Sequence, residues 1–185
     1  MKRCRREWQE PVQDWQTIVT ECGPLVWRTA YRLLGNHADA ADCFQETFLA
    51  ALELSRRQPV RNMSGLLVRL ATTRAIDRLR QRGRQEYRQG EGQESDETGR
   101  RGPADEVQAQ ELVGELREAI RRLPAQEAQV FCLRYLSEMS YRQIAGQLGI
   151  GINLVGVALY RAKARLREAL GVLQMDEDEV SHEEV

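Results

Sequence analysis

Basic side chains that suit phosphate binding are concentrated between residues 61 and 82. The set begins in a loop and continues at helical spacing: Arg61, Asn62, Arg69, Arg74, Arg78, Arg80 and Arg82. Guanidinium groups that follow a nucleic-acid backbone neutralise its phosphates and leave room for an unstacked base. The pattern favours an opened nucleic-acid strand as the ligand, and a solvated basic face is the alternative.

A second polar group precedes this basic stretch. Asp42, Gln45 and Glu46 are separated by three and four residues, so a helix places them on one face. Such a face can dock another protein by charge complementarity, although spacing alone favours a solvated surface. Phe44 and Phe48 lie one turn apart and are better explained as core residues than as platforms for stacked bases.

The strongest local pattern lies between residues 140 and 152. Ser140 followed by Gln143 predicts a capping box, and Gly149 permits the left-handed turn that ends a short helix. A second helix then begins near Ile152. Two helices joined in this way form a helix-turn-helix, which offers its second helix to the major groove of DNA. A helical hairpin used only for packing is the alternative.

The second helix of this motif changes character along its length. Its polar side chains are Asn153, Tyr160, Arg161, Lys163 and Arg165. Asn153 can contact a base edge or cap the helix, whereas the others suit phosphates, which position a protein without specifying sequence. The apolar Leu154 and Val157 form a possible protein-contact patch. We therefore expect a helix that holds DNA better than it selects DNA.

Few residues suit bond-making chemistry. The cysteines and histidines are Cys4, Cys22, Cys43, Cys132, His37 and His182, with no CxxC spacing and no cluster of metal ligands. The sequence shows no nucleophile paired with a base and no glycine-rich loop for phosphate. We expect reduced thiols, no metal, no cofactor and no enzymatic activity.

Helical periodicity predicts the elements that position these groups. Apolar residues recur at this spacing over 15–33, 41–52, 64–79, 107–123, 125–136, 140–148 and 152–170. Leu49 is expected on the inward face of the second helix, and Ser64 is expected to cap the third. No segment alternates with a period of two, so the fold class is all-α.

Composition divides the chain into two small helical domains. We expect a first domain over 8–84, a flexible acidic linker over 85–106, a second domain over 107–173 and an acidic tail over 174–185. Residues 1–90 carry 16 basic against 10 acidic side chains, whereas residues 174–185 carry six acidic side chains and no Lys or Arg. Two basic modules with an acidic linker and tail suit a polyanionic partner.

The same composition excludes a membrane protein. Of the 185 residues, 42% are hydrophobic and 30% are charged, which is ordinary for a soluble chain. No apolar run reaches the roughly 18 residues that a span requires, and the basic start is not followed by an apolar segment. We expect a cytoplasmic protein.

Four strings resemble the sigma-70 family of bacterial transcription initiation factors, specifically its extracytoplasmic-function (ECF) branch. They are "AYRLLGNHADAADCFQETFLAAL" at 30–52, "LVRLATTRAIDRLRQR" at 67–82, "AIRRLPAQEAQVFCLRYLSEMSYRQIAGQLGI" at 119–150 and "LYRAKARLREAL" at 159–170. The resemblance implies two helical domains, like sigma regions 2 and 4. It implies a factor that binds core RNA polymerase and brings it to promoter DNA, with an anti-sigma factor or other regulator as a further partner.

The resemblance also implies roles for the polar groups. Asp42, Gln45 and Glu46 match the core-polymerase-binding segment. Arg61, Asn62, Arg69, Arg74, Arg78 and Arg80 match the minus-10 segment. Asn153, Tyr160, Arg161, Lys163 and Arg165 match the minus-35 helix. The sequence departs from the family at Leu66 and Thr73, where a Trp and an Asn are common, so the minus-10 sequence stays open.

The minus-35 helix departs from the family more strongly. Leu154, Gly156 and Ala158 align with a small polar residue, a Lys and an Arg. Three interpretations follow: a working sigma factor with an unusual minus-35 preference, a sigma-like protein whose second domain mainly contacts another protein, or a simple repressor. The docking segment around Asp42 argues against the repressor.

Overall fold

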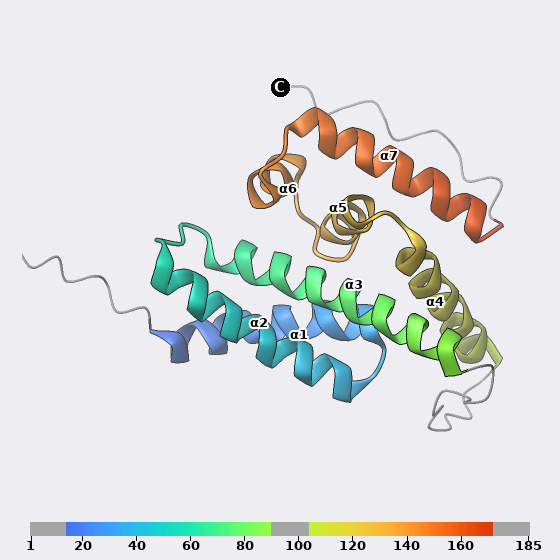
Figure 1. The fold of residues 1–185 in the computed structure, drawn as a ribbon, viewed down its shortest axis with the longest axis horizontal. Helices are drawn as coiled ribbons and strands as arrows, with labels where there is room; N and C mark the ends of the chain where they lie inside the picture. Colours follow the sequence, from blue (N-terminus) through green and yellow to red (C-terminus); the bar gives the residue numbers. More distant parts are fainter. Residues whose placement is uncertain (1–13, 90–103, 172–185) are drawn as a thin grey trace, which may run out of the picture.

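The computed structural model describes residues 14–89 and 104–171, and every regular element in these ranges is a helix. The helices are α1 (Trp15–Leu34), α2 (His37–Arg57), α3 (Met63–Gln89), α4 (Ala104–Arg122), α5 (Ala125–Tyr135), α6 (Tyr141–Leu148) and α7 (Ile152–Ala169). The all-α prediction is confirmed for the described part of the chain (Figure 1).

Local sequence signals set most helix ends. The Asp14 carboxylate accepts from the backbone N–H of Gln16 at the start of α1, and Gly35, at φ 76°, ends that helix in the left-handed region. The Asn36 side chain then caps α2 by accepting from the Asp39 N–H. Each cap satisfies a backbone group that the helix itself leaves unpaired. The turn between α1 and α2 therefore needs only two residues.

The predicted start of the third helix is wrong by about half a turn. The Asn62 side chain, rather than Ser64, accepts from the Gly65 N–H at 2.8 Å, and α3 begins at Met63. Asparagine and serine are similarly good N-caps, so position decides between them. The residue predicted as a DNA contact is thus also the helix cap.

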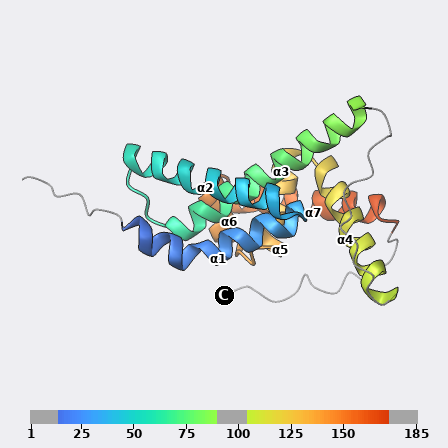
Figure 2. The same cartoon turned by 90° about the horizontal axis from the view of Figure 1, so that it is seen from below.

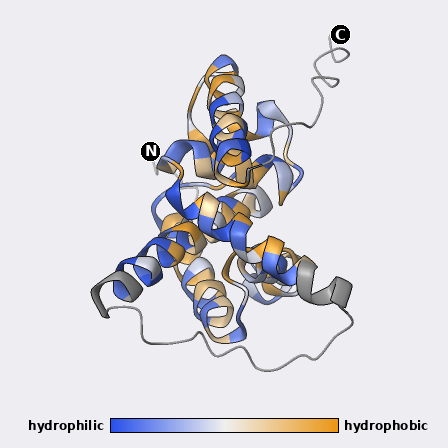
Figure 3. Ribbon diagram, turned by 90° about the vertical axis from the view of Figure 1, so that its right-hand side faces the viewer, coloured by the Kyte–Doolittle hydropathy of each residue, from blue (hydrophilic) through white to orange (hydrophobic). Residues whose placement is uncertain are grey.

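Helices α1, α2 and α3 form the first bundle. Its core contains Val26 from α1, Phe48 from α2 and Leu67 from α3. Figure 3 shows apolar and polar residues alternating along single helices, as amphipathic helices require. The inward placement predicted for Leu49 is wrong, because its side chain is 60% exposed.

The second bundle contains the predicted helix-turn-helix. Ser140 and Gln143 form the capping box of α6, and Gly149, at φ 66°, ends that helix. Helix α7 then crosses α6 at 103° and buries Val155 and Leu159. The capping box, the turn and the second helix are all confirmed.

The two bundles pack against each other along α3. Figures 1 and 2 show α3 between α1 and α2 on one side and α4 to α6 on the other. One buried cluster joins Leu33, Ile76, Ile120, Cys132 and Leu166, which come from both bundles. The domains predicted from composition therefore share a core in this structure.

The helices on both sides extend into the segment that was predicted to be a linker. Helix α3 continues to Gln89 and α4 begins at Ala104, so both edges of the 85–106 segment are helical. Residues 90–103 lie outside the described ranges, as do the tail at 174–185 and residues 8–13 of the first predicted domain.

No single helix in the described ranges has the length and apolar content to cross a membrane. Helices α6 and α7 reach that threshold only when taken together, across their 103° bend.

Candidate polymerase and nucleic-acid interfaces

Helix α2 presents a polar face to solvent. Asp42, Gln45 and Glu46 are exposed, as the helical spacing predicts. Leu49 continues the same face one turn later with an exposed side chain. Sequence periodicity assigned Leu49 to the core, and its spacing from Gln45 and Glu46 was the signal that it belongs to this surface. A polar face with an exposed apolar residue is suited to protein docking.

Two basic residues of α3 already occupy part of this face. The Arg78 guanidinium lies 2.7 Å from Glu46, 3.4 Å from Asp42 and 3.6 Å from Asp39. Arg74 lies 3.9 Å from the other Glu46 oxygen. Burial lowers the pKa of Arg78, but the hydrogen bond and charge of Glu46, with the other two carboxylates, outweigh burial and raise it. Arg78 therefore points to α2 instead of standing free.

The other predicted minus-10 residues divide between exposed and covered positions. Arg61 and Asn62 are exposed in the turn before α3. Arg80 donates to the backbone carbonyls of Arg121 and Leu123 at the end of α4. Burial, with the nearby charge of Arg74, lowers the pKa of the half-buried Arg69.

Helix α7 exposes four of its five predicted DNA contacts, and Arg165 is one of them although it also has a partner inside the protein. Asn153, Tyr160 and Arg161 are exposed, and Tyr160 keeps 75% of its accessible surface. The two other predicted contacts have internal partners. The Lys163 ammonium lies 5.5 Å from the centre of the Tyr135 ring, and the Arg165 Nε lies 3.1 Å from the buried Glu127 carboxylate.

The apolar residues at the start of α7 lie on different sides of the helix. Ile152, Leu154 and Val157 are exposed, whereas Ala158 is only 4% exposed and packs in the core. A Cβ on Gly156 would meet only Tyr141, at the ordinary contact distance of 3.9 Å. Alignment with the family had placed a DNA-contacting Arg at 158. In this structure Val157, rather than Ala158, faces outward.

Comparison with known proteins identifies the arrangement. The Sigma-70 region 2 model matches residues 18–85, and the Sigma-70, region 4 model matches residues 114–166. The ECF RNA polymerase sigma factor SigW of Bacillus subtilis is 30% identical over 159 residues, which cover 78% of this chain and 82% of SigW. The chain belongs to the sigma-70 family of RNA polymerase sigma factors.

A second relative has a similar sequence, and two solved structures share the fold. The ECF sigma factor SigE of Mycolicibacterium smegmatis is 27% identical over 168 residues, covering 88% of this chain but only 63% of SigE. RpoE from Bartonella quintana, solved with the anti-sigma factor NepR, has the same fold at a TM-score of 0.56 and 22% identity, covering 88% of this chain and 100% of RpoE. CnrH, solved with the cytosolic domain of CnrY, also has this fold, at a TM-score of 0.56 and 21% identity. The match covers 86% of this chain and 89% of CnrH.

The matched regions place the two faces in the two halves of a sigma factor. Helices α1 to α3 correspond to region 2, and α5 to α7 with the C-terminal half of α4 correspond to region 4. Sigma factors are transcription initiation factors that direct RNA polymerase to promoters, and this is the functional class of the chain.

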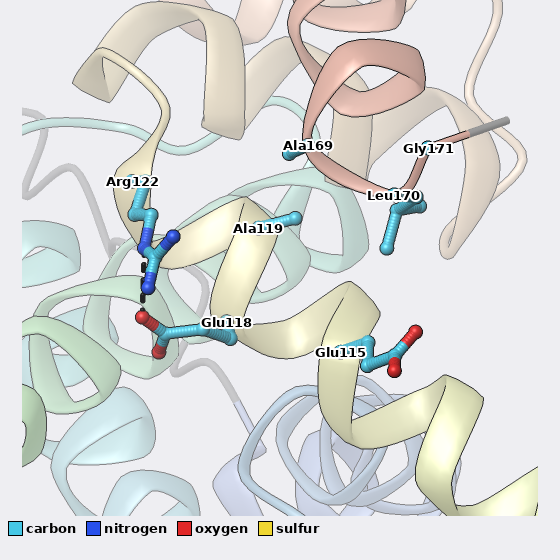
Figure 4. A pocket seen from close by; sticks show the side chains of 7 residues that line it. All are labelled: Glu115, Glu118, Ala119, Arg122, Ala169, Leu170 and Gly171. Carbon is cyan, nitrogen blue, oxygen red and sulfur yellow. Dashed lines mark hydrogen bonds and ion pairs between the residues drawn. The ribbon is translucent and has the colours of Figure 1, made fainter. Parts of the chain in front are cut away.

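One hollow of about 410 Å³ lies between α4 and the end of this sigma factor's α7. Figure 4 shows Glu118 reaching Arg122 across its edge, while Ala119 and Leu170 form part of the lining. Glu118 also accepts from Arg121, and these hydrogen bonds lower the pKa of its carboxyl group. Within the described ranges, no group of His, Cys, Asp and Glu is placed to hold a metal. The Glu118 carboxylate at the edge of the hollow is thus already paired with arginine side chains.

Proposed function

We propose that this sigma factor binds core RNA polymerase through the exposed face of α2. The observation that carries the proposal is the stripe of Asp42, Gln45, Glu46 and Leu49, which lies inside the matched region 2 and outside the bundle core. Carboxylates steer a cationic partner surface, and the exposed leucine adds apolar contact once the surfaces meet. The described residues then need no catalytic group, because the polymerase supplies the chemistry.

Promoter DNA is the second proposed partner. The turn before α3 and the basic residues of α3 are assigned to the minus-10 element, and Arg61 and Asn62 of this turn are exposed. The outward face of α7, with Asn153, Tyr160 and Arg161, is assigned to the minus-35 element. Phosphate contacts dominate this second set, so α7 is expected to position DNA more than to specify its sequence.

A protein regulator is the third proposed partner, and the cytoplasm is the proposed location. The solved relative from Bartonella quintana is bound to an anti-sigma factor, which motivates a partner of the same class here. A second candidate function follows from Ile152, Leu154 and Val157, which expose apolar surface where a DNA-reading helix usually carries polar groups. In this candidate, the second domain mainly contacts protein.

Run-off transcription with core polymerase on a randomised promoter library tests these assignments. Enrichment of paired minus-10 and minus-35 sequences is the expected outcome for a working sigma factor. Enrichment of a minus-10 element alone supports the protein-contact candidate for the second domain. Failure to bind core polymerase in a pull-down contradicts the proposal for α2.

A further inference from the structure

The outward face of α7 carries apolar side chains followed by basic ones. Helix α7 packs on α4, α5 and α6, and Figure 1 shows it on the side of the molecule away from α1 and α2. Leu154 and Val157 are exposed on this face, and the exposed Arg161 and Arg165 follow them at helical spacing. These four residues form one continuous surface, named here the α7 stripe.

The acidic charge of the second half of the chain lies immediately after this helix. Helix α7 has four basic residues and one acidic residue, Glu168. Residues 172–185 have six acidic residues and no Lys or Arg. Four of the six are consecutive, from Asp176 to Glu179, and Val180 follows them. Acidic and apolar residues of this tail therefore match the basic and apolar ends of the α7 stripe when the two segments run in opposite directions.

The length of the tail permits this pairing. Gly171, at φ 64°, occupies the left-handed region that ends a helix and turns the chain off its axis. Arg161 and Val157 lie ten and fourteen residues before Gly171, which is about 15 and 21 Å along a helix. Asp176 to Val180 lie five to nine residues after it, which an extended chain spans in about 17 to 30 Å. The acidic run is therefore long enough to reach Arg161, and Val180 is far enough along to reach Val157.

The basic end of the stripe has room for carboxylates. The Arg165 side chain is 58% exposed although its Nε contacts Glu127. A guanidinium has five N–H donors, so it can bind a second carboxylate. Exposed ion pairs are individually weak. A segment tethered to the helix by a few residues nevertheless has an effective concentration of the order of millimolar, which favours a contact that DNA phosphates can displace.

We propose that residues 176–180 bind the α7 stripe of their own chain and compete there with DNA. The carboxylates lie at Arg161 and Arg165, and Val180 covers the apolar end of the stripe. The inference rests on the proposed DNA-binding role of α7. Because DNA binds only molecules whose stripe is free, its apparent affinity is reduced by the fraction of such molecules.

Paramagnetic NMR gives the first test. A nitroxide is attached at Ser181→Cys in the full chain, which also carries Cys4→Ser and Cys22→Ser. We expect the amide signals of Leu154 and Arg161 to be broadened and those of α2 to be unchanged. Raising the salt to about 1 M, where the Debye length falls to about 3 Å, should restore the broadened signals. Sharp α7 signals at low salt would overturn the proposal.

A mixture of two labelled samples identifies the molecule that supplies the tail. One copy of the chain carries nitrogen-15 without the nitroxide, and the other carries the nitroxide without nitrogen-15. The signals of the α7 stripe should stay sharp in this mixture. Broadening equal to that within one labelled chain would assign the tail to a second copy and contradict docking within the chain.

Neutralising the tail tests its competition with DNA. The variant Asp176→Asn, Glu177→Gln, Asp178→Asn and Glu179→Gln should bind a short duplex of random sequence about tenfold more tightly than the unaltered chain at low salt. A tenfold gain corresponds to a tail that occupies the stripe in about nine of ten molecules. Unchanged affinity would contradict competition.

A matched control separates docking of the tail from a change in net charge. Glu21→Gln, Glu53→Gln, Glu111→Gln and Glu115→Gln remove as many negative charges from exposed positions on α1, α2 and α4. This control should leave the affinity for the duplex nearly unchanged, and a gain equal to that of the tail variant would overturn docking. Failure of all these proteins to bind the duplex would contradict the proposed role of α7, whereas the NMR result would still decide where the tail lies.

Discussion

The Arg78 guanidinium of α3 donates to the Glu46 carboxylate of α2 at 2.7 Å. This pair joins the face proposed for polymerase docking to the helix proposed for the minus-10 element. The side chain of Arg78 is 22% exposed and that of Glu46 is 50% exposed, so solvent weakens the pair without abolishing it. A substitution on either side therefore changes the electrostatic field of the other.

Charge reversal on α2 tests docking. We expect Asp42→Lys with Glu46→Lys to reduce affinity for core polymerase at least tenfold, because two steering charges change sign. Loss of the partners of Arg78 should cost roughly 1 kcal/mol of stability, with little change in helical circular dichroism. Glu21→Lys with Glu111→Lys, which reverses exposed carboxylates on α1 and α4, is the control and should bind normally. Normal binding by the folded α2 variant would contradict docking there.

Arg161 and Arg165 are expected to respond differently to removal, although both were predicted to contact phosphates. Arg161→Ala should preserve the melting temperature and reduce the slope of log affinity against log salt by about 0.9, the loss of one phosphate contact. Arg165→Ala should lower the melting temperature, because the 8% exposed Glu127 loses its ion-pair partner. Equal thermal stability of the two variants would show that the buried pair contributes nothing.

The start of α7 tolerates polar residues on one side only. Leu154→Thr with Val157→Lys should keep the fold and tighten duplex DNA binding, with a salt slope steeper by about 0.9 for one added cation. Ala158→Arg should destabilise the second domain by several kcal/mol, because a guanidinium would enter a filled core. Thermal unfolding and binding titrations measure both effects. A stable Ala158→Arg variant would contradict the orientation of α7.

Thiol labelling is expected to follow burial. Burial raises the pKa of Cys132 to about 12, and burial raises that of Cys43 to about 11 despite opposing hydrogen bonds and charges. Both thiols therefore stay protonated, and unreactive, well above neutral pH. In a Cys4→Ser chain, Cys22 should react first with a disulfide reagent at pH 8, and the other two should react only on unfolding. Simultaneous reaction of all three under native conditions would contradict the packing.

Local signals in the sequence were sufficient for the helices and for several of their ends. Gly35 and Gly149 occupy left-handed positions that glycine adopts without a steric penalty, and Ser140 with Gln143 completes its cap within one turn. These interactions join residues at most five positions apart. Asp42, Gln45 and Glu46 were placed on one exposed face for the same reason, since helical periodicity alone determines which residues share a face.

Contacts between distant segments decided which of these side chains are exposed and which are buried or paired. The sequence predicted an exposed basic α3, but Arg78 turns to α2 and Arg80 to the end of α4, because carboxylates and unpaired carbonyls from other elements surround them. Periodicity placed Leu49 inside, and family alignment assigned Ala158 to DNA, whereas the packing of neighbouring helices exposes the first and buries the second. The sequence by itself determined the helices, the helix-turn-helix and the family. Only tertiary structure decided which of the predicted arginines remain available for DNA, because the partners of Arg78 and Arg80 are acceptors 32 and 43 residues away, which no local pattern encodes.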